Sequence, residues 1–154
     1  MTPTALREGE PAPDFTLESD SGEPVTLSSL SGRLVVLYFY PKDDTPGCTK
    51  QASGFRDAYR EYEEHGAVVL GVSPDDTSSH RKFKQKYSLP FPLLADPDHA
   101  VAAAYGAWGE KSFAGRKYMG VIRSTFVIDP DGKVARAMYG VNAERNPSDV
   151  LAVL

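Results

Sequence analysis

The chain has 154 residues and a mass of 16.8 kDa, which fits a single domain over residues 1–154. Its net charge of −4 argues against a nucleic-acid-binding module, because such modules usually carry a basic face. The longest apolar run, residues 34–40, is far shorter than the roughly 20 residues of a membrane-spanning helix. The N-terminus has no apolar segment of signal-peptide length, so we expect a cytoplasmic protein. The sequence has one cysteine, which excludes a disulfide within the chain.

The first half of the chain predicts a hairpin and two buried strands. Residues 14–17 and 25–27 flank a turn sequence rich in Asp, Ser and Gly, which is typical of a β-hairpin. Residues 34–40 and 67–73 are continuous apolar runs, and such runs are typical of strands that are buried on both faces of a sheet.

A helix is predicted between these two strands, over residues 46–64. Aromatic residues recur within it at spacings of four and three, which places them on one face. Thr45 is the expected N-cap, Pro46 suits the first helical position, and Gly66 closes the helix. A connection of this length makes the two strands parallel, with a right-handed crossover.

The second half of the chain continues the alternation of helices and strands. In order, we expect a helix over 77–87 capped from Asp75, Asp76 or Thr77, a strand over 93–95, a helix over 98–105, strands over 124–129 and 133–139 joined by the turn Asp129-Pro130-Asp131-Gly132, and a last helix over 147–154. Residues 106–120 are rich in glycine and predict a loop, in which Trp108, Phe113 and Tyr118 either pack the loop or form an active-site rim. The sum is an α/β domain of three layers, with a central mixed sheet and helices on both faces.

Other polar residues of these segments carry no binding motif. Asp75 and Asp76 are expected to be helix caps rather than a metal pair. His80 and His99 are expected to be solvated helix residues, and the histidines lack the spacing of metal ligands.

Cys48 is the candidate reactive residue. It follows the strand over 34–40 and falls at the third position of the next helix if Thr45 is the cap. Unpaired backbone N–H groups and the positive end of the helix dipole favour the thiolate there, and the thiolate is the reactive form of cysteine. The hydroxyl of Thr45 can reach the N–H of Cys48 or a substrate oxygen, whereas the negative charges of Asp43 and Asp44, expected to be solvated, disfavour the thiolate. The alternative is a buried, inert cysteine.

The residues around Cys48 resemble a known active-site pattern. Pro41, Thr45 and Cys48 match the P-x-x-x-T-x-x-C motif of the peroxiredoxins, and the string YPKDDTPGCTKQA resembles the peroxiredoxin Q branch, also called bacterioferritin comigratory proteins. The likeness covers nearly the whole chain and includes the strings GEPAPDFTL, KYSLPFPLLAD and KYMGVIRSTFVIDPDGKV. It implies a thioredoxin-like fold and thiol-dependent reduction of hydrogen peroxide and organic hydroperoxides, with no metal or organic cofactor.

The resemblance also implies a set of site residues, namely the nucleophile Cys48 and the supporting residues Pro41, Thr45 and Arg123. For substrate binding we expect the backbone of Gly47, with the ring of Phe39 or of Tyr40 as a wall of the peroxide pocket. Arg123 would favour the thiolate and hydrogen-bond a peroxide oxygen. Thr45 and the backbone N–H of Gly47 would hold the oxygens on which charge develops. Pro41 would shield the sulfur from water without adding a competing donor, since proline has no N–H.

The chain departs from the family pattern at Ser53. Many members of this branch carry a second cysteine five residues after the first; here that position holds Ser53, and no other cysteine is present. A sulfenic acid at Cys48 would therefore be recycled by an external thiol, namely a thioredoxin, a glutaredoxin or a low-molecular-weight thiol, or would pair with another chain. Ser53 reflects either natural one-cysteine chemistry or an engineered replacement, and the sequence leaves both open.

Two other functions stay open at this point. Cys48 could serve as a peroxide sensor that passes its oxidation to a partner protein, and such a sensor would stall after one equivalent of peroxide. A monothiol oxidoreductase of the glutaredoxin type is less favoured, because the chain has no C-P-x-C or C-P-x-S element. The resemblance implies a monomer or a weak homodimer.

Overall fold

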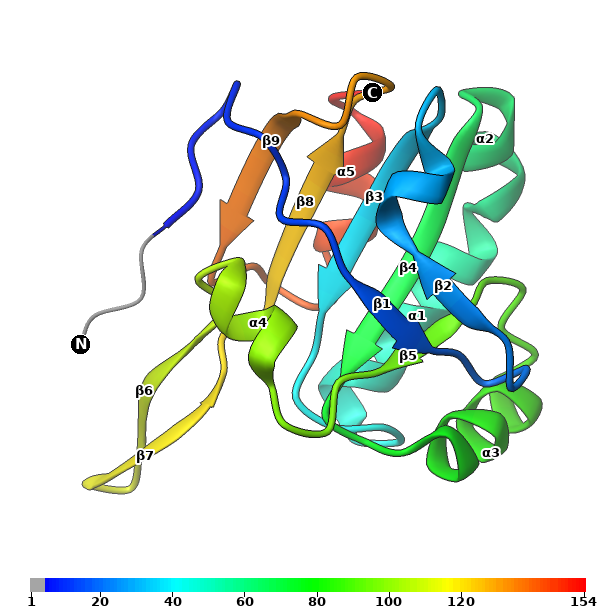
Figure 1. Cartoon of the computed structure of the whole chain (residues 1–154). Coiled ribbons are helices and arrows are strands. Elements are labelled where there is room, and N and C mark those ends of the chain that lie inside the picture. The colour runs from blue at the N-terminus through cyan, green and yellow to red at the C-terminus, as the bar shows by residue number, and fades with distance from the viewer. Residues whose placement is uncertain (1–4) are drawn as a thin grey trace.

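The computed structural model describes residues 5–154, which are built around a mixed sheet of five strands (Figure 1). The strands lie in the order β5-β4-β3-β8-β9, with the bounds β3 Leu34–Phe39, β4 Ala67–Ser73, β5 Leu93–Ala95, β8 Ser124–Ile128 and β9 Val134–Tyr139. Strand β3 lies at the centre, parallel to β4 and antiparallel to β8. Its continuous apolar sequence fits this place, because a central strand covered on both faces exposes little surface.

Alternate side chains of β3 enter two separate hydrophobic clusters. Leu37 and Phe39 pack on one face, in a cluster that includes Tyr105. Tyr38 packs on the other face, where its ring stacks on Phe55 with the ring centroids 4.7 Å apart. Because side chains alternate along a strand, the position of a residue in β3 decides which cluster it joins.

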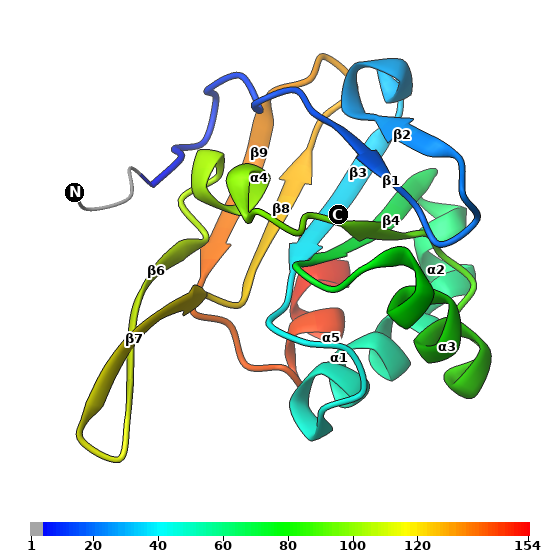
Figure 2. The same cartoon turned by 60° about the horizontal axis from the view of Figure 1, so that its bottom comes forward.

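Helices cover both faces of the sheet (Figures 1 and 2). On the face that contains Tyr38 lie α1 Pro46–Asp57, α2 Tyr59–Glu64, α3 Thr77–Tyr87 and α5 Asn146–Leu151. The opposite face is covered by α4 Ala100–Ala104, the 3-10 helix η1 Leu27–Leu30, and the hairpin of β1 Thr16–Glu18 and β2 Pro24–Thr26. The predicted three-layer α/β architecture is therefore confirmed.

The helix predicted over residues 46–64 is divided into two. Helix α1 ends at Asp57 and α2 begins at Tyr59, with Ala58 between them at φ −95° and ψ 5°. The break leaves Phe55 and Tyr62 buried in the same cluster, which explains why the aromatic spacing looked continuous. Along residues 5–154, no helix is both long and apolar enough to cross a membrane.

The segment predicted as a loop over residues 106–120 is instead mostly a β-hairpin. Strands β6 Trp108–Phe113 and β7 Arg116–Val121 pair antiparallel and extend away from the main sheet (Figures 1 and 2). Ala114 and Gly115 both have positive φ, as a two-residue hairpin turn requires. Most side chains of the hairpin are exposed, so its sequence lacks the apolar alternation that signals a half-buried strand.

Candidate active site

Cys48 is the third residue of α1 and is only 2% exposed. Helix α1 begins after the loop that leaves the carboxyl end of β3 (Figure 2), so Cys48 lies in the first turn of the helix that follows this central strand. The first turn of a helix has backbone N–H groups without intrahelical partners and the positive end of the dipole. This position favours negative charge on the sulfur atom.

Arg123 brings a fixed positive charge to the same sulfur. Its Nη2 lies 3.4 Å from Cys48 Sγ, and its Nη1 donates to Gln51 Oε1 at 2.7 Å. The antiparallel register of β3 and β8 places Ser124 opposite Phe39, so the residue before β8 lies near the end of β3. Arg123 and Cys48 are 75 positions apart in the chain, and the pairing of β3 with β8 brings them together.

Gly47 leaves room for the guanidinium group beside the first turn of α1. A Cβ atom at this position would lie 3.1 Å from Arg123 Nη2, closer than ordinary van der Waals contact. A side chain at Gly47 would therefore press on the group that contacts Cys48. Glycine allows the arginine to approach the helix backbone closely.

Gln51 and Asn146, which the sequence-based prediction did not include, orient Arg123. Gln51 is fully buried, and while its amide oxygen accepts from Arg123, its amide nitrogen donates to Asn146 Oδ1 at 3.0 Å. Asn146 Oδ1 also accepts from Thr125 Oγ1 at 2.8 Å. The signal for Gln51 was its spacing of three residues from Cys48, which places both on one helical face; Asn146 had no signal of this kind.

Pro41 and Thr45 lie on the loop between β3 and α1, and Thr45 does not cap the helix with its side chain. Its backbone is extended at the N-cap position, as expected, but its hydroxyl donates to the carbonyl oxygen of Lys42 at 2.9 Å. The predicted side-chain cap is wrong because a hydrogen bond within the loop takes the hydroxyl proton instead. Pro46 does occupy the first helical position.

Phe39 lies on the wrong face of the sheet to form a wall beside Cys48. Its ring packs 5.3 Å from Tyr105 and 5.9 Å from Phe126, measured between centroids, in the cluster opposite that of Cys48. The expectation for Phe39 is therefore corrected: its neighbour Tyr40 shares the cluster of Cys48, because adjacent side chains of a strand point to opposite faces.

Asp43 and His80, both expected to be solvated, are buried. Asp43 is 8% exposed, and its carboxylate accepts from Tyr40 Oη at 2.6 Å and Ser79 Oγ at 2.7 Å. His80 is fully buried, with Nδ1 at 2.7 Å from Asp43 Oδ2. The expectation failed because Asp43 and His80 lie on separate segments, the loop after β3 and helix α3, which sequence spacing alone does not bring together.

Asp44, by contrast, is exposed as expected. Its carboxylate accepts from Lys86 Nζ and Tyr87 Oη, each at 2.8 Å. The hydrogen bond from Lys86 is the main cause that lowers the pKa of Asp44, followed by that from Tyr87. Asp44 has a φ of 57°, in the left-handed region, which aspartate tolerates better than most residues.

Lys111 is a second cation near the site, and its charge interacts with those of Arg123 and Cys48. Its Nζ donates to the carbonyl oxygen of Val121 at 2.9 Å, across the β6–β7 hairpin. Burial is the main cause that lowers the pKa of Lys111, and the positive charge of Arg123 lowers it further.

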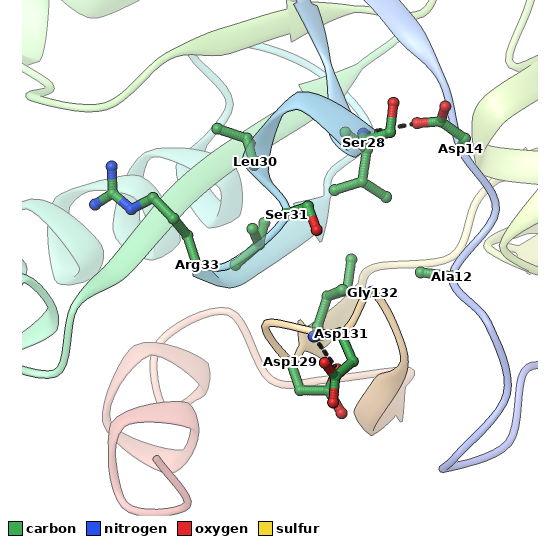
Figure 3. A pocket seen from close by; sticks show the side chains of 12 residues that line it. Ala12, Asp14, Ser28, Leu30, Ser31, Arg33, Asp129, Asp131 and Gly132 are labelled. Atoms are coloured by element: carbon green, nitrogen blue, oxygen red, sulfur yellow. Dashed lines mark hydrogen bonds between the residues drawn. The ribbon is translucent and has the colours of Figure 1, made fainter.

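A pocket of about 230 Å³ lies at the other end of the sheet (Figure 3). Asp14, Ser28, Arg33 and Asp131 are among its lining residues, and Val35 contributes from the start of β3. Cys48 follows the carboxyl end of the same strand, so the pocket is separate from the cysteine site. Among residues 5–154, no group of three or more His, Cys, Asp or Glu side chains is placed to hold a metal ion.

Comparison with protein families gives a match over residues 9–137 to the AhpC/TSA family. A putative peroxiredoxin bcp from Coxiella burnetii is 46% identical over 150 residues, covering 97% of this chain and 99% of the relative. Peroxiredoxin Bcp from Bacillus subtilis is 46% identical over 146 residues, covering 95% and 93%.

Solved structures give the same picture. PrxQ from Xylella fastidiosa, in a cysteine-to-serine variant, superposes with a TM-score of 0.91 at 31% identity, covering 97% of this chain and 96% of that one. A structure of the bacterioferritin comigratory protein from Xanthomonas campestris, described for its alkyl peroxide reduction activity, gives a TM-score of 0.86 at 37% identity, covering 90% and 88%. These neighbours confirm the thioredoxin-like fold. The chain belongs to the AhpC/TSA family, in the Bcp or peroxiredoxin Q branch, and is a thiol-dependent peroxidase.

Proposed function

We propose that Cys48 is the peroxidatic cysteine of a one-cysteine cycle. The observation that carries the proposal is the contact between Cys48 Sγ and Arg123 Nη2 at 3.4 Å, at the start of a helix. Both the guanidinium charge and the helix dipole stabilise a thiolate, which is the nucleophilic form.

In the first half of the cycle, the thiolate attacks the terminal oxygen of a hydroperoxide. An S–O bond forms, the O–O bond breaks, and the leaving alkoxide or hydroxide takes up a proton to become an alcohol or water. Arg123 and the backbone N–H groups at Gly47 and Cys48 are the donors that meet the charge developing on the two oxygens. Thr45 hydrogen-bonds the peroxide, and Pro41 limits water at the sulfur without supplying an N–H donor.

The second half of the cycle uses a thiol from outside the chain. Ser53 lies in α1 at the position of the second cysteine in the peroxiredoxin Q pattern that the chain resembles, and Cys48 is the single cysteine of the sequence. One thiol condenses with the sulfenic acid to give a mixed disulfide and water, and a second thiol releases Cys48. Thioredoxin, glutaredoxin and low-molecular-weight thiols are the candidate reductants.

Hydrogen peroxide and organic hydroperoxides are the proposed substrates. Alkyl peroxide reduction by the Xanthomonas campestris relative supports the organic class. A single domain over residues 1–154, a monomeric or weakly dimeric state, and a cytoplasmic location stay predictions.

Stopped-flow peroxide reduction with a panel of thiol donors tests this proposal. We expect continuous turnover with at least one external thiol and no peroxide consumption by Cys48→Ser, because that variant lacks the nucleophile. Peroxide consumption retained by Cys48→Ser would refute the assignment. Consumption that stops after one equivalent with every donor would refute the cycle and favour a peroxide sensor.

A further inference from the structure

His80 forms hydrogen bonds through both ring nitrogens while fully buried. Nε2 lies 2.9 Å from the carbonyl oxygen of Leu94 in β5, and Nδ1 lies 2.7 Å from Asp43 Oδ2. A carbonyl oxygen only accepts, so Nε2 carries a proton. The contact with Asp43 contains one further proton, whether it is bonded to the imidazole or to the carboxyl group.

The carboxylate of Asp43 contacts three polar side chains. Besides His80, its carboxylate accepts from Tyr40 Oη and Ser79 Oγ, and its backbone N–H donates to Asp75 Oδ2 at 2.8 Å. Burial raises the pKa of Tyr40 well above its usual value, so that hydroxyl remains a donor. The buried carboxylate of Asp43 thus joins helix α3 to the loop that leads from β3 to α1.

Residues 40–45, here called the active-site loop, lead from β3 to α1 and include Pro41 and Thr45, to which the proposed function gives roles. Asp43 lies between Pro41 and Thr45, and the loop ends where α1 begins. The backbone at Asp44 is in the left-handed region, with φ 57°, which costs free energy for a residue other than glycine. Such a conformation persists where surrounding contacts determine it. Side chains of α3 contact both residues here: Ser79 and His80 bond to Asp43, and Lys86 and Tyr87 bond to Asp44.

We propose that His80 is a positioning residue of the peroxidase, which fixes the active-site loop through Asp43. His80 is anchored to the sheet by its bond to Leu94 and reaches the loop by its bond to Asp43. It thereby holds Pro41 and Thr45 in place relative to the first turn of α1. The inference rests on the proposed roles of Pro41, Thr45 and Cys48, and adds a residue outside their motif.

Two substitutions of His80 separate its two hydrogen bonds. In His80→Gln, the side-chain nitrogen occupies the place of Nε2, so the bond to Leu94 is kept and the contact with Asp43 is lost. In His80→Asn, the side-chain nitrogen occupies the place of Nδ1, so the contact with Asp43 is kept. His65→Asn is the matched control, because His65 is an exposed histidine at the C-cap of α2.

The main measurement is the second-order rate constant for oxidation of Cys48 by peroxide. We expect His80→Gln to lower this constant about 10- to 100-fold, since small displacements of positioned groups have effects of this size. His80→Asn is expected to restore most of the rate, and His65→Asn to match the wild type. Alkylation of Cys48 by iodoacetamide at neutral pH should stay near the wild-type rate in His80→Gln, because Arg123 and α1 are unchanged.

The variant Asp43→Asn tests the same contact from the other side. We expect the double variant with His80→Gln to be no slower than the slower single variant, because both substitutions remove one interaction. Equal oxidation rates for His80→Gln and the wild type, or no rescue by His80→Asn, would overturn the proposal. So would parallel losses of oxidation rate, alkylation rate and melting temperature in His80→Gln, which indicate a loosened fold. Wild-type protein that consumes no peroxide would instead refute the proposed function itself.

Discussion

The guanidinium group of Arg123 makes two contacts: Nη2 contacts the sulfur of Cys48, and Nη1 donates to the amide oxygen of Gln51. The bond to Gln51 leaves Nη2 directed at the sulfur, and Gln51 is in turn held by Asn146. An arginine fixed in this way costs little reorganisation when charge develops on a bound peroxide.

Replacing Arg123 by Gln should slow peroxide reduction about 100-fold, because one positioned donor and its charge are removed. Alkylation of Cys48 by iodoacetamide at neutral pH should also slow, since less of the sulfur is then ionised. Stopped-flow oxidation and timed alkylation measure the two effects. Arg60→Gln is the matched control, because Arg60 is exposed on α2. An alkylation rate equal to that of the control would remove the electrostatic role given to Arg123.

Asp44 and Lys86 predict an acid-dependent contribution to stability. The hydrogen bond from Lys86 lowers the pKa of Asp44 below its ordinary 3.8 in the folded state. The contribution is therefore fully present above pH 3.8 and is lost as the pH falls through the lowered folded pKa. Denaturant unfolding of the wild type and Asp44→Asn should differ near neutral pH and converge in acid. A difference that persists unchanged below that pKa would exclude this pair as its source.

At the level of elements, helix α1 carries both Cys48 and Ser53. Five residues of α-helix rise about 7.5 Å, which exceeds the Cα–Cα separation of about 4.4–6.8 Å that a disulfide allows. Helix α1 is also fixed at this place by α5: a Cβ on Gly54 would lie only 2.7 Å from Pro147 Cγ, which shows how closely the two helices pack.

The substitution Ser53→Cys should therefore form an internal disulfide after peroxide treatment only by unwinding part of α1. We expect mass spectrometry to find that disulfide, and hydrogen exchange to show loss of protection in α1 but not in β3 once it has formed. Cys48→Ser in the same background controls for disulfides between chains. Sulfenic or over-oxidised Cys48 with no internal disulfide would mean that α1 does not open.

For the molecule as a whole, the elements that could be predicted are those whose burial produces a recognisable pattern of apolar residues in the sequence. Strands β3 and β4 are covered on both faces and read as apolar runs, and the turn at 129–132 was visible because Asp129 accepts from the N–H groups of Asp131 and Lys133. The β6–β7 hairpin was missed because it packs little against the core. Its exposed Phe113, Tyr118 and Met119 belong to no cluster that periodicity could signal.

The motif residues of the site could be predicted from the sequence, whereas the residues that hold them in position could not. Cys48, Thr45 and Pro41 share one local segment, and Arg123 was found through resemblance. His80 and Asn146 act through contacts between distant elements, so neither spacing nor composition revealed them. Gln51 shares a helical face with Cys48, but its contact with Arg123 comes from a distant segment. The expectation for Phe39 was wrong for a different reason: side chains alternate along β3, and the ring of Phe39 lies on the face opposite Cys48.

The near-complete burial of Cys48 has a kinetic consequence for recycling. A small thiol needs little room at the sulfur, so we expect its rate of attack to rise in proportion to its concentration. Another folded protein cannot insert its own cysteine while the first turn of α1 is closed. Reduction by a protein thiol should therefore saturate, and the plateau would equal the frequency at which that turn opens.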